Sequence, residues 1–402
     1  MSYLSYLLFR FLTFPLGYLP YSWIWFLGNQ LGRAVFYLYP RYRKRALSNL
    51  ALASSLFLSP EQIKDLAIRS LQSLTITFLE YPKLKREKDI SQIVTCENPE
   101  VAQDLLKSGQ GVIFFCGHQA NWELFFLEGT QRMAGTAIGK PIKNRYLYNW
   151  VLELRQKYGG KIVLPKNALK EGLRTLKTSA FFGIVGDQGM PDSGFSSSFL
   201  GRVAWTSPLP ALLSLRTNRP IFVATIQRTK DRYLIRYSNP IWPSPQSTAD
   251  CLMAQVLILF ERSIKETPSQ WLWIHNRWKQ SLPGKLPKRL RQECLALIFP
   301  SLVLAQETLP LFRLIYPREF LTAFIPATSS DMSSDISSLP QDIEFKLYST
   351  LSDILIPDYR FKLIYDFTRN PLIKKHFLSL SAFHVETPHS AQDIKDLVNH
   401  AR

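Results

Sequence analysis

From residue 98 to residue 237 the chain alternates between short apolar runs and longer amphipathic segments, and no other feature restricts its fold as much. The short runs predict buried strands, at 111–116, 161–164, 180–185, 221–226 and 233–237. The amphipathic segments predict helices, at 122–134, 145–158 and 168–177. Strands and helices that alternate in this way form α/β domains. We therefore predict an α/β core at residues 90–285, with a central mixed, mostly buried sheet flanked by helices.

A helical lead-in is predicted ahead of this core, at residues 46–90. Its main helix starts at Ser59-Pro60-Glu61-Gln62, where serine can act as the N-cap and proline suits the first turn. Beyond residue 285 the chain changes character, because 286–291 is basic and 327–338 is a linker rich in serine and aspartate. We assign residues 286–402 to a C-terminal extension of unknown role.

The N-terminal segment contains an uncharged run of 22 residues, from Phe11 to Gly32. A helix of that length can cross a hydrocarbon core of about 30 Å, and the tyrosines and tryptophans of the run suit the headgroup region. The basic cluster at 41–45 is expected to stay on the cytoplasmic side of the membrane. We therefore predict that residues 1–45 form a membrane-anchor helix and its basic flank.

The form of this anchor stays open, because Pro15, Gly17 and Pro20 interrupt the apolar run. A crossing helix and a bent helix in the membrane interface both fit the sequence. A helix buried in a soluble domain is the third alternative. A cleaved signal peptide fits poorly, because the basic cluster follows the apolar run instead of preceding it.

The charge of the chain is strongly positive and unevenly distributed. Lys and Arg number 49 against 31 Asp and Glu, and the last 102 residues hold 10 basic and 12 acidic side chains, so the first 300 carry the whole excess. Such a field attracts phosphorylated substrates, anionic membranes, acidic proteins or nucleic acid. With an apolar N-terminal segment beside it, membrane lipid is favoured and nucleic acid is not expected as a partner.

The most informative motif is Gly117-His118-Gln119-Ala120-Asn121-Trp122-Glu123, which follows the predicted strand at 111–116. Reactive groups gather at the carboxyl ends of strands in α/β sheets. Glu123 stands in the first turn of the next helix, where its carboxylate could hold the imidazole of His118 in one tautomer. The pair predicts a general base acting on an alcohol. Without its context, a histidine and a glutamate five residues apart would be an ordinary occurrence.

Two further polar clusters follow other strand-like segments. Asp187 and Gln188 come directly after the predicted strand at 180–185, where they could serve a site or simply form a turn. Lys140, Lys143 and Arg145 form a cationic patch that could bind phosphate or a developing oxyanion, or could be a solvated loop. We predict all five residues as substrate-binding candidates.

Cysteine and histidine give no sign of a metal site. The four cysteines stand far apart in the sequence, at Cys96, Cys116, Cys251 and Cys294. No Cys-x-x-Cys pair and no histidine at ligand spacing accompanies them. We expect neither a metal nor another cofactor.

The sequence resembles the lipid A late acyltransferases of lauroyl and myristoyl type, bacterial inner-membrane enzymes related to the lysophospholipid acyltransferases. The resemblance extends over about residues 1–282. It rests on four blocks in the family's order and spacing: GHQANWEL, KPIKNRYLYNWVLELRQKYGG, GDQGMPDSGFSSSFLGRVAWTSP and PSQWLWIHNRWK.

The resemblance implies a glycerol-phosphate-acyltransferase-like fold and transfer of an acyl chain from acyl carrier protein to a hydroxyl of a lipid A precursor. It implies that His118 is the base, that Glu123 orients it, and that Asp187 and Gln188 belong to the active-site cleft. It places Lys140 at the reacting group, where the family commonly has arginine. Lysine keeps the positive charge but lacks the two parallel N–H donors of a guanidinium. The enzyme would work at the cytoplasmic face of the inner membrane.

Two other functions remain compatible with the sequence. The same residues could acylate another lipid, such as a lysophospholipid or a phosphoinositide mannoside, and acyl-CoA could replace the carrier protein as donor. Alternatively, the chain could be a non-catalytic membrane scaffold that binds anionic lipid, with His118 in a structural role.

Overall fold

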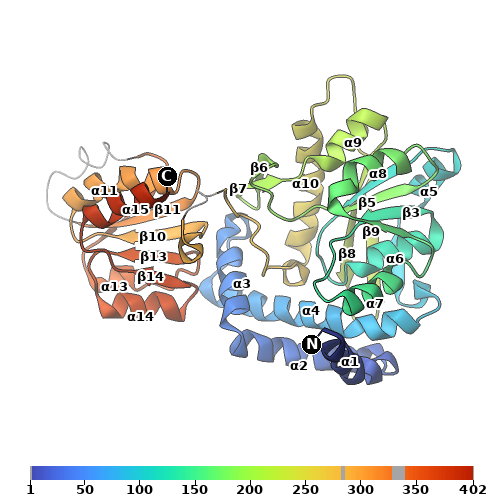
Figure 1. The fold of residues 1–402 in the computed structure, drawn as a ribbon, viewed down its shortest axis with the longest axis horizontal. Helices are drawn as coiled ribbons and strands as arrows, with labels where there is room; N and C mark the ends of the chain where they lie inside the picture. Colours follow the sequence, from blue (N-terminus) through green and yellow to red (C-terminus); the bar gives the residue numbers. More distant parts are fainter. Residues whose placement is uncertain (1, 282–285, 328–339, 402) are drawn as a thin grey trace. The chain divides into compact units, whose positions relative to one another are not determined.

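A computed structural model of the protein describes residues 2–281, 286–327 and 340–401. The chain forms two compact units (Figure 1). Unit 1 comprises Met1–Leu38, Ile68–Leu200 and Thr206–Leu272, and unit 2 comprises Tyr39–Ala67, Gly201–Trp205 and Trp273–Arg402.

Unit 1 is built on a seven-stranded sheet in the order β1-β9-β8-β2-β5-β3-β4. Neighbouring strands are parallel except for β8 and β9, so the predicted mixed sheet is confirmed, and it is mostly parallel. The strands, in sheet order, are β1 (Val94–Glu97), β9 (Tyr233–Tyr237), β8 (Ile221–Arg228), β2 (Val112–Cys116), β5 (Phe181–Val185), β3 (Gly135–Ile138) and β4 (Lys161–Val163). Two further strands, β6 (Phe195–Phe199) and β7 (Arg202–Thr206), pair separately.

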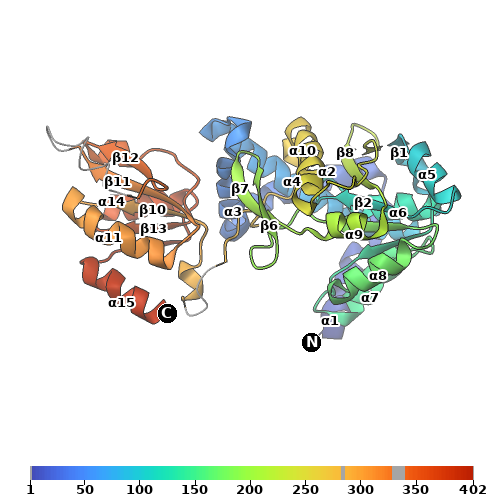
Figure 2. The same ribbon diagram turned by 90° about the horizontal axis from the view of Figure 1, so that it is seen from above.

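Helices cover both faces of this sheet (Figure 2). One face is covered by α5 (Glu100–Lys107), α6 (Glu123–Arg132) and α7 (Arg145–Arg155), whose apolar side chains join the core cluster that contains Phe114, Phe181 and Phe222. The other face is covered by α8 (Ala168–Thr175), α9 (Leu209–Thr217) and α10 (Ala249–Glu266). This division follows from right-handed crossovers, because the chain moves outward from β2 to β4 and then returns through β5 to β8. Short 3₁₀ segments include η3 (Ile90–Gln92), η4 (Pro165–Asn167) and η5 (Pro268–Gln270).

The uncharged N-terminal run is divided among α1 (Ser2–Thr13), η1 (Phe14–Gly17) and α2 (Tyr21–Leu38). Nowhere in the described chain does a helix combine the length and the apolar character needed to cross a membrane. The predicted membrane-anchor helix is therefore not supported. Proline at positions 15 and 20 accounts for the break, because a helix cannot continue its hydrogen bonds through it.

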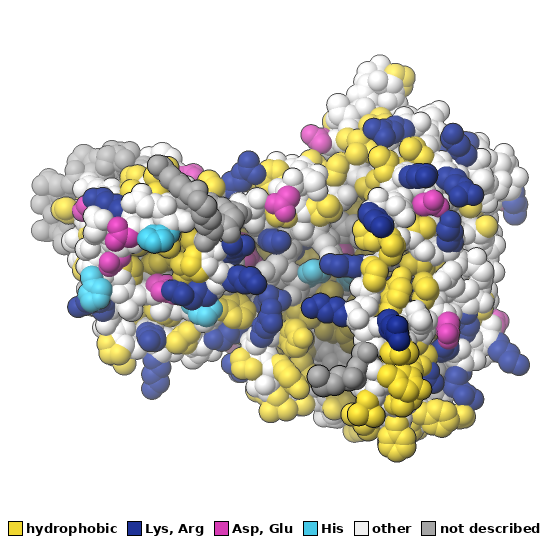
Figure 3. All heavy atoms as spheres, viewed as in Figure 1, with side chains coloured by type: hydrophobic (Ala, Val, Ile, Leu, Met, Phe, Trp, Pro, Cys, Tyr) yellow, Lys and Arg dark blue, Asp and Glu magenta, His cyan; other side chains and the backbone are white. Residues whose placement is uncertain are grey.

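The helix α2 packs closely on α4 (Pro60–Arg86), and glycine makes this contact possible. A Cβ atom on Gly32 would lie 2.3 Å from Cα of Gln72 on α4. The opposite surface of these N-terminal helices is apolar. Figure 3 shows hydrophobic side chains gathered where α1 and α2 lie in Figure 1. More than half of the surface of each of these side chains is exposed: Leu4, Leu8, Phe11, Leu12, Phe14, Tyr18, Trp23 and Phe26.

Unit 2 contains a second α/β sheet, for a region to which sequence analysis assigned no fold. Its five strands are all parallel, in the order β12-β11-β10-β13-β14. They are β12 (Glu344–Tyr348), β11 (Phe320–Pro326), β10 (Cys294–Ile298), β13 (Leu363–Asp366) and β14 (His384–Glu386). The helices of this unit are α3 (Pro40–Leu52), α11 (Leu302–Ile315), α13 (Leu351–Ile354), α14 (Pro371–Ser379) and α15 (Ala391–Ala401), with 3₁₀ segments η2 (Ser54–Leu56) and η6 (Lys288–Leu290). The predicted linker at 327–338 lies outside the described residues apart from Ala327.

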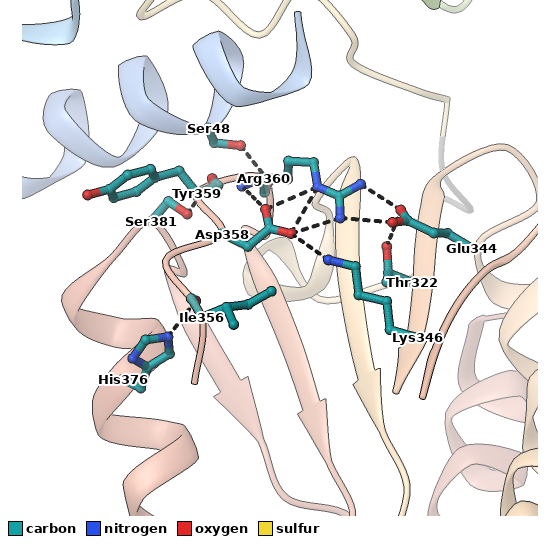
Figure 4. Close-up of polar contacts among 10 residues, drawn as sticks. All are labelled: Ser48, Thr322, Glu344, Lys346, Ile356, Asp358, Tyr359, Arg360, His376 and Ser381. Atoms are coloured by element: carbon teal, nitrogen blue, oxygen red, sulfur yellow. Dashed lines mark hydrogen bonds and ion pairs between the residues drawn. The ribbon is translucent and has the colours of Figure 1, made fainter. Parts of the chain in front are cut away.

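A charge network joins one edge of this sheet to the segment before β13 (Figure 4). The guanidinium of Arg360 donates to Asp358 at 2.8 Å and to Glu344 at 2.6 Å, and the ammonium of Lys346 lies 3.2 Å from Asp358. The hydroxyl of Ser48, on α3, donates to the carbonyl of Arg360 at 2.7 Å. These contacts link β12 and α3 to the same loop and have an evident structural role.

Candidate active site

The candidate histidine lies in the loop between β2 and α6, where glycine is required at position 117. A Cβ atom on Gly117 would lie 2.0 Å from the ring of Phe260 and 3.0 Å from a carboxylate oxygen of Asp187. Any side chain there would push the loop away from Asp187. The glycine therefore lets the backbone approach the carboxylate closely.

The same loop is held on both sides by backbone contacts. The amide of Ala120 donates to the carbonyl of Gln270 at 2.7 Å, and the carbonyl of His118 accepts from the amide of Leu272 at 3.0 Å. On α4, the hydroxyl of Thr77 donates to the carbonyl of Ala120 at 2.7 Å. Ala120 adopts φ 41°, a left-handed conformation that is strained for alanine. These bonds fix the loop in this shape. They also give Gln270 and Leu272, in the sequence block PSQWLWIHNRWK, a structural role.

His118 is bonded to Asp187 through its ring and through its backbone. Nδ1 of the imidazole lies 2.7 Å from Oδ1 of Asp187, and the amide of His118 donates to Oδ2 at 2.8 Å. The indole of Trp271 donates to the same Oδ2 at 2.8 Å. The histidine side chain is 17% exposed and the aspartate only 2%.

The electrostatics of this pair favour a charged aspartate. Burial alone would raise the pKa of Asp187, but the nearby His118 ring and the hydrogen bonds from His118 and Trp271 hold it well below its usual range. An ionised carboxylate bonded to Nδ1 keeps the proton of a neutral imidazole on that nitrogen. Nε2 is then the nitrogen with a lone pair.

Glu123, predicted as the partner of His118, is bonded to other residues. Its carboxylate accepts two bonds from the guanidinium of Arg155, at 2.6 and 2.7 Å, and one from the hydroxyl of Tyr81 at 2.8 Å. Although burial opposes ionisation, Arg155 and these hydrogen bonds lower the pKa of Glu123. The expected bond between Glu123 and His118 is therefore replaced by one between Asp187 and His118. The reason is that the carboxyl ends of β2 and β5 are neighbours in the sheet.

A second buried carboxylate lies below the loop. Glu80, on α4, is fully buried and accepts hydrogen bonds from Asn121 at 2.6 Å, from the indole of Trp25 at 2.5 Å and from the hydroxyl of Tyr233. Burial raises its pKa, while Arg228 and the hydrogen-bond donors oppose the shift. The Asn121 amide thus connects the loop to α4 and to the sheet.

The loop faces an open cavity of about 460 Å³ at the carboxyl ends of the strands. His118, Glu123, Lys140 and Gln188 all line it, as the predicted site requires. Asp187 lies behind His118. The structure places the other two candidates differently, because Lys143 and Arg145 are exposed and neither belongs to the residues described as lining this cavity.

A second, apolar cavity of about 50 Å³ adjoins the first on the side of the core of unit 1. The two share Trp122, Phe126, Ala137 and Val185. The inner cavity continues between α6 and the sheet, and its remaining lining residues are Phe114, Cys116, Phe125, Gly129, Phe181, Gly183, Ala224 and Tyr237. Apart from the Tyr237 hydroxyl, which donates to Glu128 at 2.9 Å, these side chains are apolar or weakly polar.

Cys116 is not a candidate nucleophile. It is fully buried, and burial followed by the charge of Asp187 raises the pKa of its thiol. In the described part of the chain, His, Cys, Asp and Glu side chains form no group of three that could hold a metal ion. The chemistry available to the cavity is therefore that of the imidazole, the carboxylates and the cations around it.

The family model for bacterial lipid A biosynthesis acyltransferases matches residues 1–280. That is well over half of the chain. The chain belongs to this family. A search among curated proteins gave no significant match.

Membership makes the protein an acyltransferase of lipid A and lipopolysaccharide biosynthesis, with a lipid A precursor as acceptor and an acyl donor. The match covers every residue of the cavity described above. It ends before most of unit 2, whose sheet begins at Cys294.

Proposed function

We propose that the protein transfers a fatty acyl chain from acyl carrier protein to a hydroxyl of a lipid A precursor, with His118 as the general base. The observation that carries the proposal is the imidazole at the wall of an open cavity, bonded through Nδ1 to a buried, ionised carboxylate. This arrangement suits proton abstraction from an alcohol at Nε2. The family supplies the acceptor class.

The reaction then follows from the positions of the side chains. Nε2 of His118 takes the hydroxyl proton of the acceptor while the oxygen attacks the thioester carbonyl carbon, and Asp187 stabilises the imidazolium that forms. The tetrahedral intermediate carries its negative charge on the former carbonyl oxygen. Lys140, in the cavity wall, is the cation available to stabilise that oxygen. The carbon–sulfur bond breaks, the imidazolium returns the proton to the thiolate, and an ester and a free thiol leave.

Glu123 and Arg155 have a different role in this proposal. Arg155 lines the cavity, and its guanidinium is fixed by two bonds to Glu123. Such a bidentate pair holds both side chains in one geometry. In this proposal, Glu123 and Arg155 hold the cavity wall beside His118 in position. Gln188 makes a polar contact with the substrate.

The inner apolar cavity is the proposed site of the acyl chain. It shares wall residues with the cavity that contains His118, and apolar and aromatic side chains surround it. A fatty acyl chain would enter it past Trp122 and Phe126, leaving the thioester beside the imidazole.

We further propose that unit 1 works at the cytoplasmic face of the inner membrane through α1, η1 and α2. Large apolar side chains of these elements are more than half exposed, including Phe11, Trp23 and Phe26. Arginines at positions 10 and 33 flank them. A surface of apolar and basic residues suits the interface of an anionic bilayer without requiring a crossing helix.

The test is a reaction of the purified full chain with acyl carrier protein thioesters and a tetraacylated lipid A precursor, followed by mass spectrometry. The proposal predicts that the precursor gains the mass of one acyl group. Parallel reactions with acyl-CoA, with a lysophospholipid and with a phosphoinositide mannoside decide donor and acceptor. Transfer only to one of those other acceptors, or no transfer from any thioester, would contradict the proposal.

A further inference from the structure

The outer face of α8 carries a row of cations beside a row of leucines. Lys170 and Arg174 stand four residues apart, so they share one face of the helix, and Lys177 lies in the turn that follows it. Leu169 and Leu173, four residues apart, form the neighbouring row. These five residues line a shallow groove on the surface of unit 1, and all three cations are exposed. We call them the α8 surface.

The charges of the α8 surface are only weakly compensated among the described residues, because Glu171 attracts Lys170 and Arg174 without a salt bridge to either. None of its three cations has an ion-pair partner in the described part of the chain. The nearby acid of the same helix, Glu171, is paired with Lys161 at 2.9 Å. The nearby Lys166, one turn before Lys170, is also exposed and extends the positive strip. A strip of this kind attracts an acidic partner at long range.

The same helix also contributes to the reaction cavity. Pro165 and Ala168, just before and at the start of α8, line the cavity that contains His118. The helix is 8 residues long, or about 12 Å. A partner seated on the α8 surface would therefore lie beside the entrance through which an acyl thioester must pass.

We propose that the α8 surface docks the acidic carrier protein that delivers the acyl chain, an inference that rests on the proposed function. An acidic helix of the carrier places its carboxylates on Lys170, Arg174 and Lys177 and an apolar side chain between Leu169 and Leu173. Its thioester arm then reaches past Ala168 into the cavity. A bilayer is the less suitable occupant, because the large, strongly exposed aromatic side chains of unit 1 gather on α1, η1 and α2 instead.

The test compares two charge-reversed variants of the full chain. Lys170→Glu/Arg174→Glu reverses the two cations on the helix, and Lys230→Glu/Lys265→Glu changes the net charge equally at exposed lysines outside α8. Fluorescence anisotropy measures binding of labelled acyl carrier protein to each. Initial rates with carrier-linked acyl donor give kcat and KM, and thermal unfolding verifies that both variants fold.

The proposal predicts that K170E/R174E weakens carrier binding and raises KM for the carrier-linked donor by roughly tenfold, with the effect confined to KM. The wild-type affinity falls with rising salt, and the variant shows a shallower dependence. The control variant stays within about twofold of the wild type. An unchanged affinity and KM in K170E/R174E, with wild-type transfer intact, would overturn the docking surface and leave the proposed function standing.

Two other results have distinct meanings. If the wild type binds the carrier through α8 but transfers no acyl group, the docking surface holds and the proposed function fails. If K170E/R174E binds the carrier normally but loses affinity for vesicles of anionic phospholipid, the strip is a lipid surface and the proposal is wrong.

Discussion

Asp187 accepts three hydrogen bonds, and its two carboxylate oxygens share them unequally. Oδ2 accepts from two N–H groups that cannot reverse direction, the amide of His118 and the indole of Trp271. Among the described residues, the hydrogen-bond partner of Oδ1 is Nδ1 of the imidazole. The tautomer of His118 is thus decided by a single atom of Asp187.

Replacing Asp187 by asparagine tests this arrangement. The amide oxygen must occupy the Oδ2 position to accept from the two fixed donors, so the amide nitrogen faces Nδ1 and donates to it. The imidazole then carries its proton on Nε2 and cannot act as a base. We expect Asp187→Asn to lower kcat by about 10³- to 10⁴-fold, measured by mass spectrometry of the acylated lipid.

Glu123→Gln is the matched control. It removes the charge of the carboxylate that lines the cavity, and this carboxylate is bonded to Arg155 instead of His118. We expect a smaller loss of kcat, accompanied by a lower melting temperature because Arg155 loses its partner. If Glu123→Gln abolished turnover while Asp187→Asn left it intact, the assignment of Asp187 as the orienting residue would be wrong.

Most of the candidate residues selected from the sequence lie together in the structure, but their pairing differs from the predicted one. His118, Lys140 and Gln188 were selected because each follows a strand-like segment, and the structure brings them to one cavity. The partner of His118 could not be predicted, because it depends on which strands are neighbours. Arg155 was not selected at all, since nothing in a helical sequence marks one arginine as facing a buried glutamate.

At the scale of the elements, local patterns predicted the strands and helices of the core with small shifts. The predicted strand at 180–185 is β5, and the predicted helix at 145–158 ends earlier, at Arg155. The parallel sheet of unit 2 was not predicted. Its strand β10 is an apolar run buried throughout, like the predicted β2, but no sequence with clear alternating strands and helices was recognised around it.

The inner apolar cavity makes a prediction about acyl-chain length. A Cβ atom on Gly183 would meet Cβ of Ala137 at 3.4 Å, an ordinary contact, so a side chain can begin at this position of the cavity wall. We expect Gly183→Val to lower kcat/KM for a longer acyl donor, relative to one two carbons shorter, by roughly tenfold. Initial rates with a series of acyl carrier protein thioesters measure this ratio.

Gly183→Ala provides the graded control, because one methyl group should change the preference less than an isopropyl group. Thermal unfolding shows whether either variant is destabilised. An equal loss of rate at every chain length would place the acyl chain elsewhere.

The N-terminal elements make a second prediction, about membrane binding. Phe11 is 78% exposed and Trp23 is 58% exposed, so replacing them leaves the packing of unit 1 intact. We expect Phe11→Ser/Trp23→Ser to lower affinity for vesicles containing anionic phospholipid by at least about tenfold. Co-sedimentation with vesicles measures the bound fraction.

Ile258→Ser/Val303→Ser is the control, because both residues are apolar and exposed but lie outside α1, η1 and α2. This variant should bind vesicles like the wild type. Equal binding by both double variants would show that the N-terminal elements are not the membrane contact.

At the scale of the whole molecule, the sequence predicted the class of chemistry and the α/β fold of unit 1, but not the second sheet in unit 2. The excess of positive charge in the first 300 residues pointed to anionic partners, and the family match agrees with an acceptor derived from lipid A. The 22-residue apolar run left a crossing helix and a bent interfacial helix both open, and in the structure it is divided into separate elements at the prolines. Length and hydropathy alone do not show where a helix breaks or what it packs against.

The central claim is that the imidazole of His118 is the base of an acyl transfer. The most direct measurement is the rate at which wild-type protein and His118→Ala convert a tetraacylated lipid A precursor to its acylated product. The account predicts that His118→Ala loses at least about 10³-fold in rate, while its melting temperature and its binding to the lipid stay close to those of the wild type. A folded His118→Ala variant that acylates the precursor within a few-fold of the wild-type rate would contradict the account.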